Sequence, residues 1–222
     1  MDDRRISRRR WLRDLVAGVA GVALWPARRA AASEFNRFRV VQVTVGDLPP
    51  ARPEASFVLA QEVRFRTAVD VKLDRVVVPM ASNAIFDHPF LLWVGEGYFP
   101  PLTPGERSNL ATFVRSGGFL LIDNAGEGGA QVVFDRRVRA ELAAVLPEAS
   151  LSPVPQTHVL FRSFYKTTSV FGRRARRNHV EGIVLEDRLA IVLSHNDLAG
   201  AWSRDGFGAW RFEALPDRKS VV

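Results

Sequence analysis

Polar side chains and glycines follow three short apolar runs in this chain of 222 residues. The runs cover residues 90–94, 119–122 and 189–193. After them come Gly95, Glu96 and Gly97, then Asp123 and Asn124, and finally His195 and Asp197. If the three runs are neighbouring parallel strands, these residues meet at one edge of a sheet, which is where open α/β sheets bind ligands. We therefore predict a binding crevice at that edge.

Acid–base catalysis is one chemistry that these residue types allow. Asp123 and His195 could together activate water for hydrolysis, with or without a divalent metal ion, if they lie within hydrogen-bond reach of each other. The chain has no cysteine, which excludes thiol nucleophiles and cysteine-based metal sites. It also lacks the motifs H-E-x-x-H, G-x-S-x-G and G-x-G-x-x-G and the P-loop pattern.

A binding module without chemistry is therefore the function that the sequence favours. Its partner would be a small polar ligand or another protein of the cell envelope, and we expect no cofactor and no bound metal ion. A hydrolase that uses Asp123 and His195 stays open as the alternative. A structural subunit of a larger envelope assembly is the third interpretation.

The chain has two dense clusters of basic residues. The net charge is +7, but the first 32 residues hold eight arginines and three aspartates and so carry five of these charges. The remainder is close to neutral, so we do not expect binding to nucleic acid. The second cluster, Arg173, Arg174, Arg176 and Arg177, predicts a solvated loop, with contact to phosphate head groups or an acidic polymer as the alternative.

The first 32 residues have the features of an export signal. Arg8 and Arg9 lie in the segment SRRRWLR, which resembles the twin-arginine motif of bacterial export signals. An apolar run over residues 15–25 and the small residues Ala30, Ala31 and Ala32 follow this motif. We predict cleavage after Ala32 and a periplasmic location, and an uncleaved leader would associate the protein with the membrane.

Alternating strands and helices are predicted in the rest of the chain. Strand patterns cover residues 38–45 and 76–78, and helical spacing covers residues 54–66. Thr103 and Glu106 form a capping-box pattern, and the helix that they begin lies between two apolar runs, which makes a βαβ unit. A further helix is expected at 135–146 and a hairpin at 182–193. These elements predict an α/β protein with a mostly parallel sheet.

Five segments together carry a family resemblance: PFLLWVGEG, LTPGERSNLATFVRSGGFLLIDNAG, FDRRVRAELAAVLPE, HVLFRSFY and EGIVLEDRLAIVLSHNDL. In this order they resemble the bacterial family filed as domain of unknown function 4159. The resemblance implies a single α/β domain over residues 33–222, with the three-layer, flavodoxin-like fold of class I glutamine-amidotransferase-like proteins.

The resemblance also bears on the site and on the C-terminus. It adds His158, Arg162 and Tyr165 to the predicted crevice. The amidotransferase chemistry does not carry over, because those relatives use a cysteine nucleophile. Family members continue past the region that matches Trp210, so we expect the C-terminal part to be truncated here.

Overall fold

The computed structural model describes residues 37–163, 166–205, 207–209, 211 and 212. The chain divides into two compact units, Met1–Arg37 and Phe38–Val222, and every described helix and strand belongs to the second. The predicted export signal with Arg8 and Arg9, its cleavage site, Tyr165 and the C-terminal end lie outside the described residues. Among the described helices, none is both long enough and apolar enough to cross a membrane.

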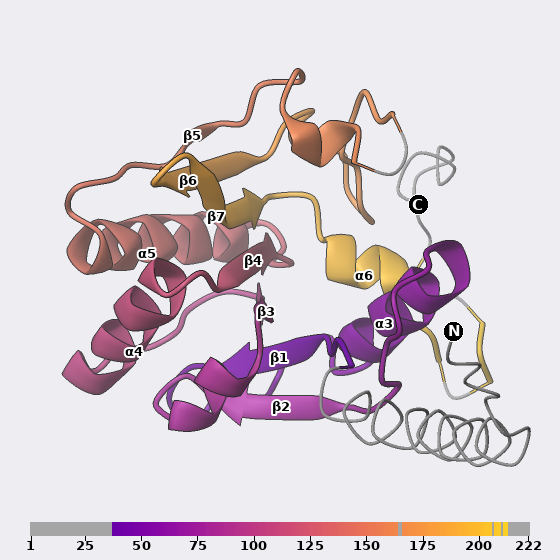
Figure 1. Ribbon diagram of the computed structural model, residues 1–222, viewed down its shortest axis with the longest axis horizontal. Helices are drawn as coiled ribbons and strands as arrows, with labels where there is room; N and C mark the ends of the chain where they lie inside the picture. Colours follow the sequence, from indigo (N-terminus) through magenta and orange to yellow (C-terminus); the bar gives the residue numbers. More distant parts are fainter. Residues whose placement is uncertain (1–36, 164–165, 206, 210, 213–222) are drawn as a thin grey trace, which may run out of the picture. The chain divides into compact units, whose positions relative to one another are not determined.

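Seven strands form one sheet in the order β2-β1-β3-β4-β7-β6-β5 (Figure 1). β1 to β4 and β7 are parallel, whereas β6 is antiparallel to β7 and β5 is antiparallel to β6. The predicted α/β protein with a mostly parallel sheet is thus confirmed. The elements in chain order are β1 (Val41–Thr44), α3 (Ala55–Arg66), β2 (Val76–Pro79), η1 (Asn83–Asp87), β3 (Phe90–Gly95), α4 (Pro104–Arg115), β4 (Phe119–Asn124), α5 (Gly129–Val145), β5 (Ser152–Pro153), η2 (Val159–Phe161), β6 (Glu181–Leu185), β7 (Arg188–Ser194) and α6 (Leu198–Trp202).

Helices cover both faces of the sheet. α4 and α5 pack against one face, where residues such as Val43, Leu120 and Phe134 form the larger hydrophobic core. α3 and α6 pack against the other face through a second cluster that includes Leu92 and Ala199. Figure 1 shows the two helix pairs on opposite sides of the strands. Because side chains alternate along a strand, residues next to each other in a strand point to different helix pairs.

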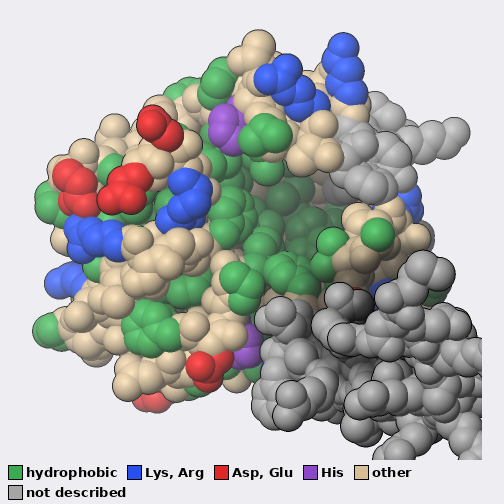
Figure 2. Space-filling model, in the orientation of Figure 1, with side chains coloured by type: hydrophobic (Ala, Val, Ile, Leu, Met, Phe, Trp, Pro, Cys, Tyr) green, Lys and Arg blue, Asp and Glu red, His purple; other side chains and the backbone are tan. Residues whose placement is uncertain are grey.

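The face that carries α3 and α6 also has an apolar groove of about 330 Å³. Its walls are almost entirely hydrophobic and include Phe90, Leu121, Leu160, Val192 and Trp202. Figure 2 shows a hollowed, largely hydrophobic area near the middle of the view. Apolar side chains over the central strands are therefore accessible on this face.

Local sequence signals explain where several elements begin and turn. Thr103 Oγ1 accepts a hydrogen bond from Glu106 N at 3.2 Å, and Glu106 Oε2 accepts one from Thr103 N at 2.8 Å, which is the predicted capping box. The predicted hairpin is formed by β6 and β7, and its turn residues Glu186 and Asp187 have φ values of 48° and 60°. α5 begins before the predicted start at residue 135, because Gly128, with φ of 51°, turns the chain directly into the helix.

Candidate functional site

A crevice of about 350 Å³ lies at the carboxyl ends of β1 and β3. Its walls come from the two strand ends and from the loops that follow them, and they include Thr44, Pro50, Trp93, Glu96 and Tyr98. β1 and β3 are neighbours in the sheet, but the helices that follow them, α3 and α4, pack on opposite faces. Where the helices that follow two neighbouring strands lie on opposite faces, a crevice opens at the sheet edge, and α/β proteins bind ligands there.

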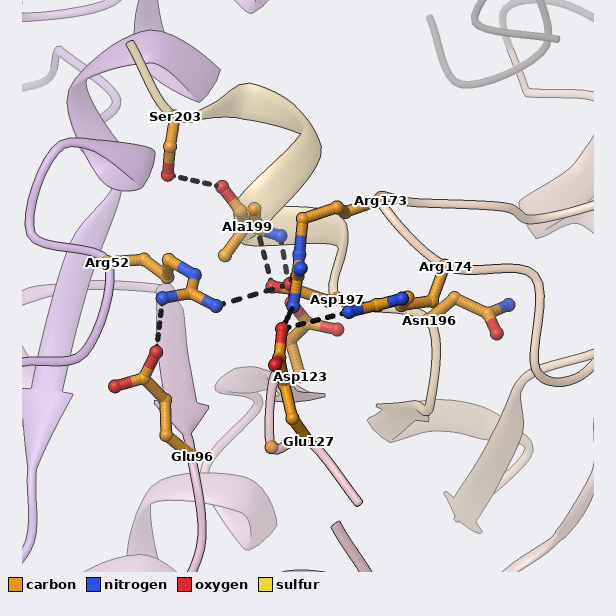
Figure 3. Close-up of polar contacts among 12 residues, drawn as sticks. Arg52, Glu96, Asp123, Glu127, Arg173, Arg174, Asn196, Asp197, Ala199 and Ser203 are labelled. Atoms are coloured by element: carbon orange, nitrogen blue, oxygen red, sulfur yellow. Dashed lines mark hydrogen bonds and ion pairs between the residues drawn. The ribbon is translucent and has the colours of Figure 1, made fainter. Parts of the chain in front are cut away.

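Asp197, in the loop after β7, is the centre of an ion-pair cluster (Figure 3). Its side chain is fully buried, and its Oδ2 accepts hydrogen bonds from Arg52 Nη2 at 3.3 Å and from Arg173 Nε. Its Oδ1 accepts one from Gly200 N at 2.9 Å, so the same carboxylate caps the start of α6. The ring of Phe212 lies against both guanidinium groups. The Cζ atom of Arg52 is 4.5 Å from the centre of this ring, and the Cζ atom of Arg173 is 4.9 Å from it.

Two exposed glutamates complete this group. Glu96 pairs with Arg52, and Glu127 accepts hydrogen bonds from Arg173 at 2.5 Å and from Arg174 at 2.9 Å. The side chain of Glu96 is 49% exposed and that of Glu127 is 61% exposed, against 14% for Arg52 and 8% for Arg173. The hydrogen bonds from the two arginines lower the pKa of Glu127 to about 2. We call these six residues the Asp197 cluster: Arg52, Glu96, Glu127, Arg173, Arg174 and Asp197.

Both exposed glutamates lie between glycines, because residues 95–97 and 126–128 have the same sequence, Gly-Glu-Gly. A Cβ atom at Gly95 would overlap the ring of Phe134, and one at Gly126 would lie 2.8 Å from the backbone N of Gln131. Glycine at these positions therefore allows the first turns of α5 to pack closely on the ends of β3 and β4. The packing brings the two acidic loops to the same edge of the sheet.

Asp123, the penultimate residue of β4, lies just before the second acidic loop and is fully buried beside Asp197 (Figure 3). Its Oδ2 accepts a hydrogen bond from Ala199 N at 2.8 Å, and its Oδ1 has no hydrogen-bond partner among the described residues. Burial, together with the nearby charge of Asp197, raises the pKa of Asp123 from 3.8 to about 7. Much of the population therefore keeps a proton on this carboxyl group near neutral pH.

The basic run over residues 173–177 is a solvated loop only in part. Arg173 is buried in the Asp197 cluster, and Arg176 donates hydrogen bonds to three backbone carbonyl groups at the ends of β4 and β7. Asn196 holds the same loop, since its Oδ1 accepts hydrogen bonds from the backbone N of Arg176 and Arg177 at 2.8 and 2.9 Å. The carbonyl groups at strand ends need donors, and the side chain of Arg176 supplies them.

His195 and Asp123 lie on opposite faces of the sheet. Asp123 is in register with Ser194, so the next residue, His195, points toward α5. His195 Nε2 is 2.8 Å from Glu181 Oε2, and its Nδ1 is 3.8 Å from Asp135 Oδ1. No hydrogen bond or ion pair joins Asp123 to His195, both of which are described. The structure therefore does not assemble the acid–base pair of the hydrolase alternative.

Asp135, Glu181 and His195 each place one possible ligand atom within 4.8 Å of the others, a spacing that could hold a metal ion. Arg139 already donates hydrogen bonds to the carboxylates of Asp135 and Glu181, and Arg177 donates one to Glu181 at 3.0 Å. A metal ion would have to displace these arginines, so the contacts describe an ion-pair network. Burial lowers the pKa of His195 below its ordinary 6.5, which keeps the ring neutral at neutral pH.

The predicted residues of the first two strand ends lie together. Gly95, Glu96 and Gly97 line the crevice. Asn124 shapes the next loop, because its Oδ1 accepts a hydrogen bond from Gly126 N at 3.2 Å. These residues, with Asp123 and Asp197, occupy the carboxyl edge of the sheet.

His158 and Arg162 lie elsewhere, on either side of the short helix η2. His158 Nδ1 accepts a hydrogen bond from Leu160 N at 3.1 Å and so caps that helix. Arg162 is exposed. Within the part of the chain that is described, neither side chain has a hydrogen bond or ion pair with the Asp197 cluster.

Four residues of the cluster, Arg52, Glu127, Arg173 and Arg174, are absent from the crevice that the sequence predicts. For Glu127 a signal exists, since Gly-Glu-Gly occurs after two successive strands. For Arg52 there is none, because its partner Asp197 lies 145 positions away in the sequence.

A family model described as "Domain of unknown function (DUF4159)" matches residues 37–219. A search of curated proteins found no match.

Proposed function

The chain belongs to the family described as domain of unknown function DUF4159, and we propose that it is an exported α/β protein that binds a small polar ligand without converting it. The observation that carries this proposal is the crevice of about 350 Å³ at the ends of β1 and β3. Ligand pockets usually have volumes of roughly 300–1,000 Å³, apolar and aromatic walls and a few polar groups. The crevice has all three properties, with Trp93 and Tyr98 in its walls and Glu96 at its polar side.

For the fold we infer the flavodoxin-like, three-layer arrangement of class I glutamine-amidotransferase-like proteins. The parallel strands follow the order β2-β1-β3-β4-β7, which corresponds to the order 2-1-3-4-5 of flavodoxin-like sheets. In that arrangement the ligand site lies between the first and third strands. The position of the crevice therefore supports both the inferred fold and the binding role.

Binding is favoured over hydrolysis because the groups that hydrolysis would need are engaged elsewhere. Asp123 is fully buried, and His195 contacts Glu181 on the other face of the sheet. Glu96, the one acidic residue among the described residues that line the crevice, is paired with Arg52. A protein of the cell envelope is the second kind of partner that we propose for this edge of the sheet.

Ligand-induced stabilisation of the full-length protein tests the binding role. A ligand that binds only the folded state raises the unfolding temperature, so a library of polar metabolites can be screened in this way. Leu48 lines the crevice and is 42% exposed, so Leu48→Trp is expected to narrow the crevice and to abolish the stabilisation. Val184→Trp, at a 52% exposed position on β6, is the control. Equal stabilisation of Leu48→Trp and wild type by every ligand found would refute binding in the crevice.

We also propose export to the periplasm by the twin-arginine route, on the basis of Arg8 and Arg9 and the apolar run that follows them. Replacement of both arginines by lysine is expected to keep the protein in the cytoplasm in a fractionation experiment. The same replacement of Arg4 and Arg5, which precede the motif, leaves export unchanged. Efficient export of the Arg8→Lys/Arg9→Lys variant would argue against this route.

A further inference from the structure

We propose that Arg52, Arg173 and Arg174 form a binding site for a phosphate group, and that Glu96 and Glu127 occupy this site in the ligand-free protein. The inference rests on the proposed binding role and specifies the chemistry of the ligand. A phosphate group would sit at the rim of the crevice, because Glu96 belongs both to the crevice wall and to the Asp197 cluster.

The charges of the Asp197 cluster match this ligand. Its three arginines carry three positive charges, and its three carboxylates carry three negative charges. One of these carboxylates, Asp197, is fully buried between Arg52 and Arg173. If Glu96 and Glu127 leave, two positive charges are uncovered. A phosphate monoester carries about 1.5 to 2 negative charges at pH 7 and so restores the balance.

The two kinds of carboxylate differ in how firmly they are held. Asp197 has two arginine partners and a backbone partner, and no part of it is exposed. Glu96 and Glu127 are about half exposed and lie on loops of the sequence Gly-Glu-Gly. Water reaches the carboxylates of Glu96 and Glu127 and competes with the arginines for them, so these ion pairs are weaker than those of Asp197. The glutamates can therefore leave while Asp197 keeps the guanidinium groups of Arg52 and Arg173 in place.

The geometry of the arginines is preorganised for an oxyanion. Arg52 and Asp197 both have left-handed backbone conformations, with φ of 51° and 52°, and they contact each other. Strained conformations of this kind persist where the surrounding structure holds them, often at binding sites. Arg52 Nε also has no hydrogen-bond partner among the described residues. Guanidinium groups present donors in a planar fork that matches the oxygens of phosphate.

Calorimetric titration of the full-length protein with inorganic phosphate tests the site, at constant ionic strength set with potassium chloride. Glu127→Gln removes one competing charge and is expected to tighten phosphate binding about two- to fivefold, the factor that an exposed ion pair contributes. Glu148→Gln is the matched control, because Glu148 is also exposed and paired with an arginine, Arg115, at 2.7 Å. Arg174→Ala, at a position that is 45% exposed, is expected to weaken binding by at least the same factor.

The site is refuted if Glu127→Gln and Glu148→Gln bind phosphate equally, or if Arg174→Ala binds as wild type does. Vesicles of phosphatidylcholine with and without phosphatidic acid separate the two sources of phosphate. Arg174-dependent binding to the phosphatidic acid vesicles assigns the site to a lipid head group, and binding of free phosphate alone assigns it to a soluble ligand. Inorganic phosphate has no organic part, so Leu48→Trp is expected to bind it normally. A crevice ligand whose binding is insensitive to Arg174→Ala would therefore refute this inference and leave the proposed function intact.

Discussion

Replacement of Asp123 by asparagine is expected to stabilise the protein by an amount that grows as the pH rises. Asp123 is fully buried beside Asp197, and its pKa is raised from 3.8 to about 7. A carboxyl group that holds its proton more tightly in the folded state costs stability as soon as the pH exceeds the pKa of the unfolded state. Asparagine resembles the protonated carboxyl group in shape and does not ionise.

The size of the effect follows from the two pKa values of Asp123. At low pH the carboxyl group is protonated in both states, and it makes no pH-dependent contribution. One pKa unit corresponds to about 1.4 kcal/mol, so the cost to the free energy of unfolding approaches about 4 kcal/mol above neutral pH. About 2 kcal/mol of this cost is already present at pH near 5. The stability difference between the variant and wild type should therefore grow by about 2–3 kcal/mol between pH near 5 and pH near 8.

Urea unfolding of both proteins over this pH range measures the difference directly. Asp187→Asn is the control for the loss of one negative charge, since Asp187 is exposed in the turn between β6 and β7. The lowered pKa of His195 acts in the opposite direction, because stability is lost as the pH falls below the unfolded-state value of 6.5. This contribution is common to both proteins and cancels in the comparison.

One result would refute the reasoning about Asp123. If the stability difference between Asp123→Asn and wild type is the same at pH near 5 and pH near 8, Asp123 does not change its ionisation in that range. The burial of its carboxyl group beside Asp197 would then not produce the raised pKa.

Three further substitutions test individual parts of the fold and the site by urea unfolding at neutral pH. Thr103→Ala removes the cap of α4 and is expected to lower the free energy of unfolding by about 1 kcal/mol, whereas Thr103→Ser should lower it much less. Equal losses of stability in the two variants would exclude the hydroxyl group of Thr103 as the cause. Gly95→Ala forces a methyl group into the ring of Phe134, and a loss of about 1–3 kcal/mol is expected; an unchanged stability would contradict the close packing of α5 on β3. Arg173→Ala leaves buried Asp197 with one arginine fewer and is expected to cost about 3–5 kcal/mol; a loss below about 1 kcal/mol would place this pair among ordinary surface ion pairs.

The convergence of polar residues at one sheet edge could be predicted because it depends on short patterns. Three apolar runs become β3, β4 and β7, which are parallel neighbours in the sheet. The face to which each polar side chain points could not be predicted in the same way. Asp123 lies inside β4, and His195 follows directly after β7, so alternation places them on opposite faces. In strands that are apolar on both sides, the sequence carries no alternation from which the faces can be assigned.

By itself the sequence determined the α/β class, the capped helix α4 and the family, because these depend on periodicity, caps and motifs within short stretches of chain. Only the tertiary structure decided which charges meet. Arg52 and Asp197 are 145 positions apart, and they contact each other because the strand order brings the loop after β1 and the loop after β7 to the same edge of the sheet. An ion pair between distant residues leaves no periodic signal in the sequence, since either partner alone looks like an ordinary charged residue of a loop. The burial that fixes these partners, and that raises the pKa of Asp123, exists only once the sheet is assembled.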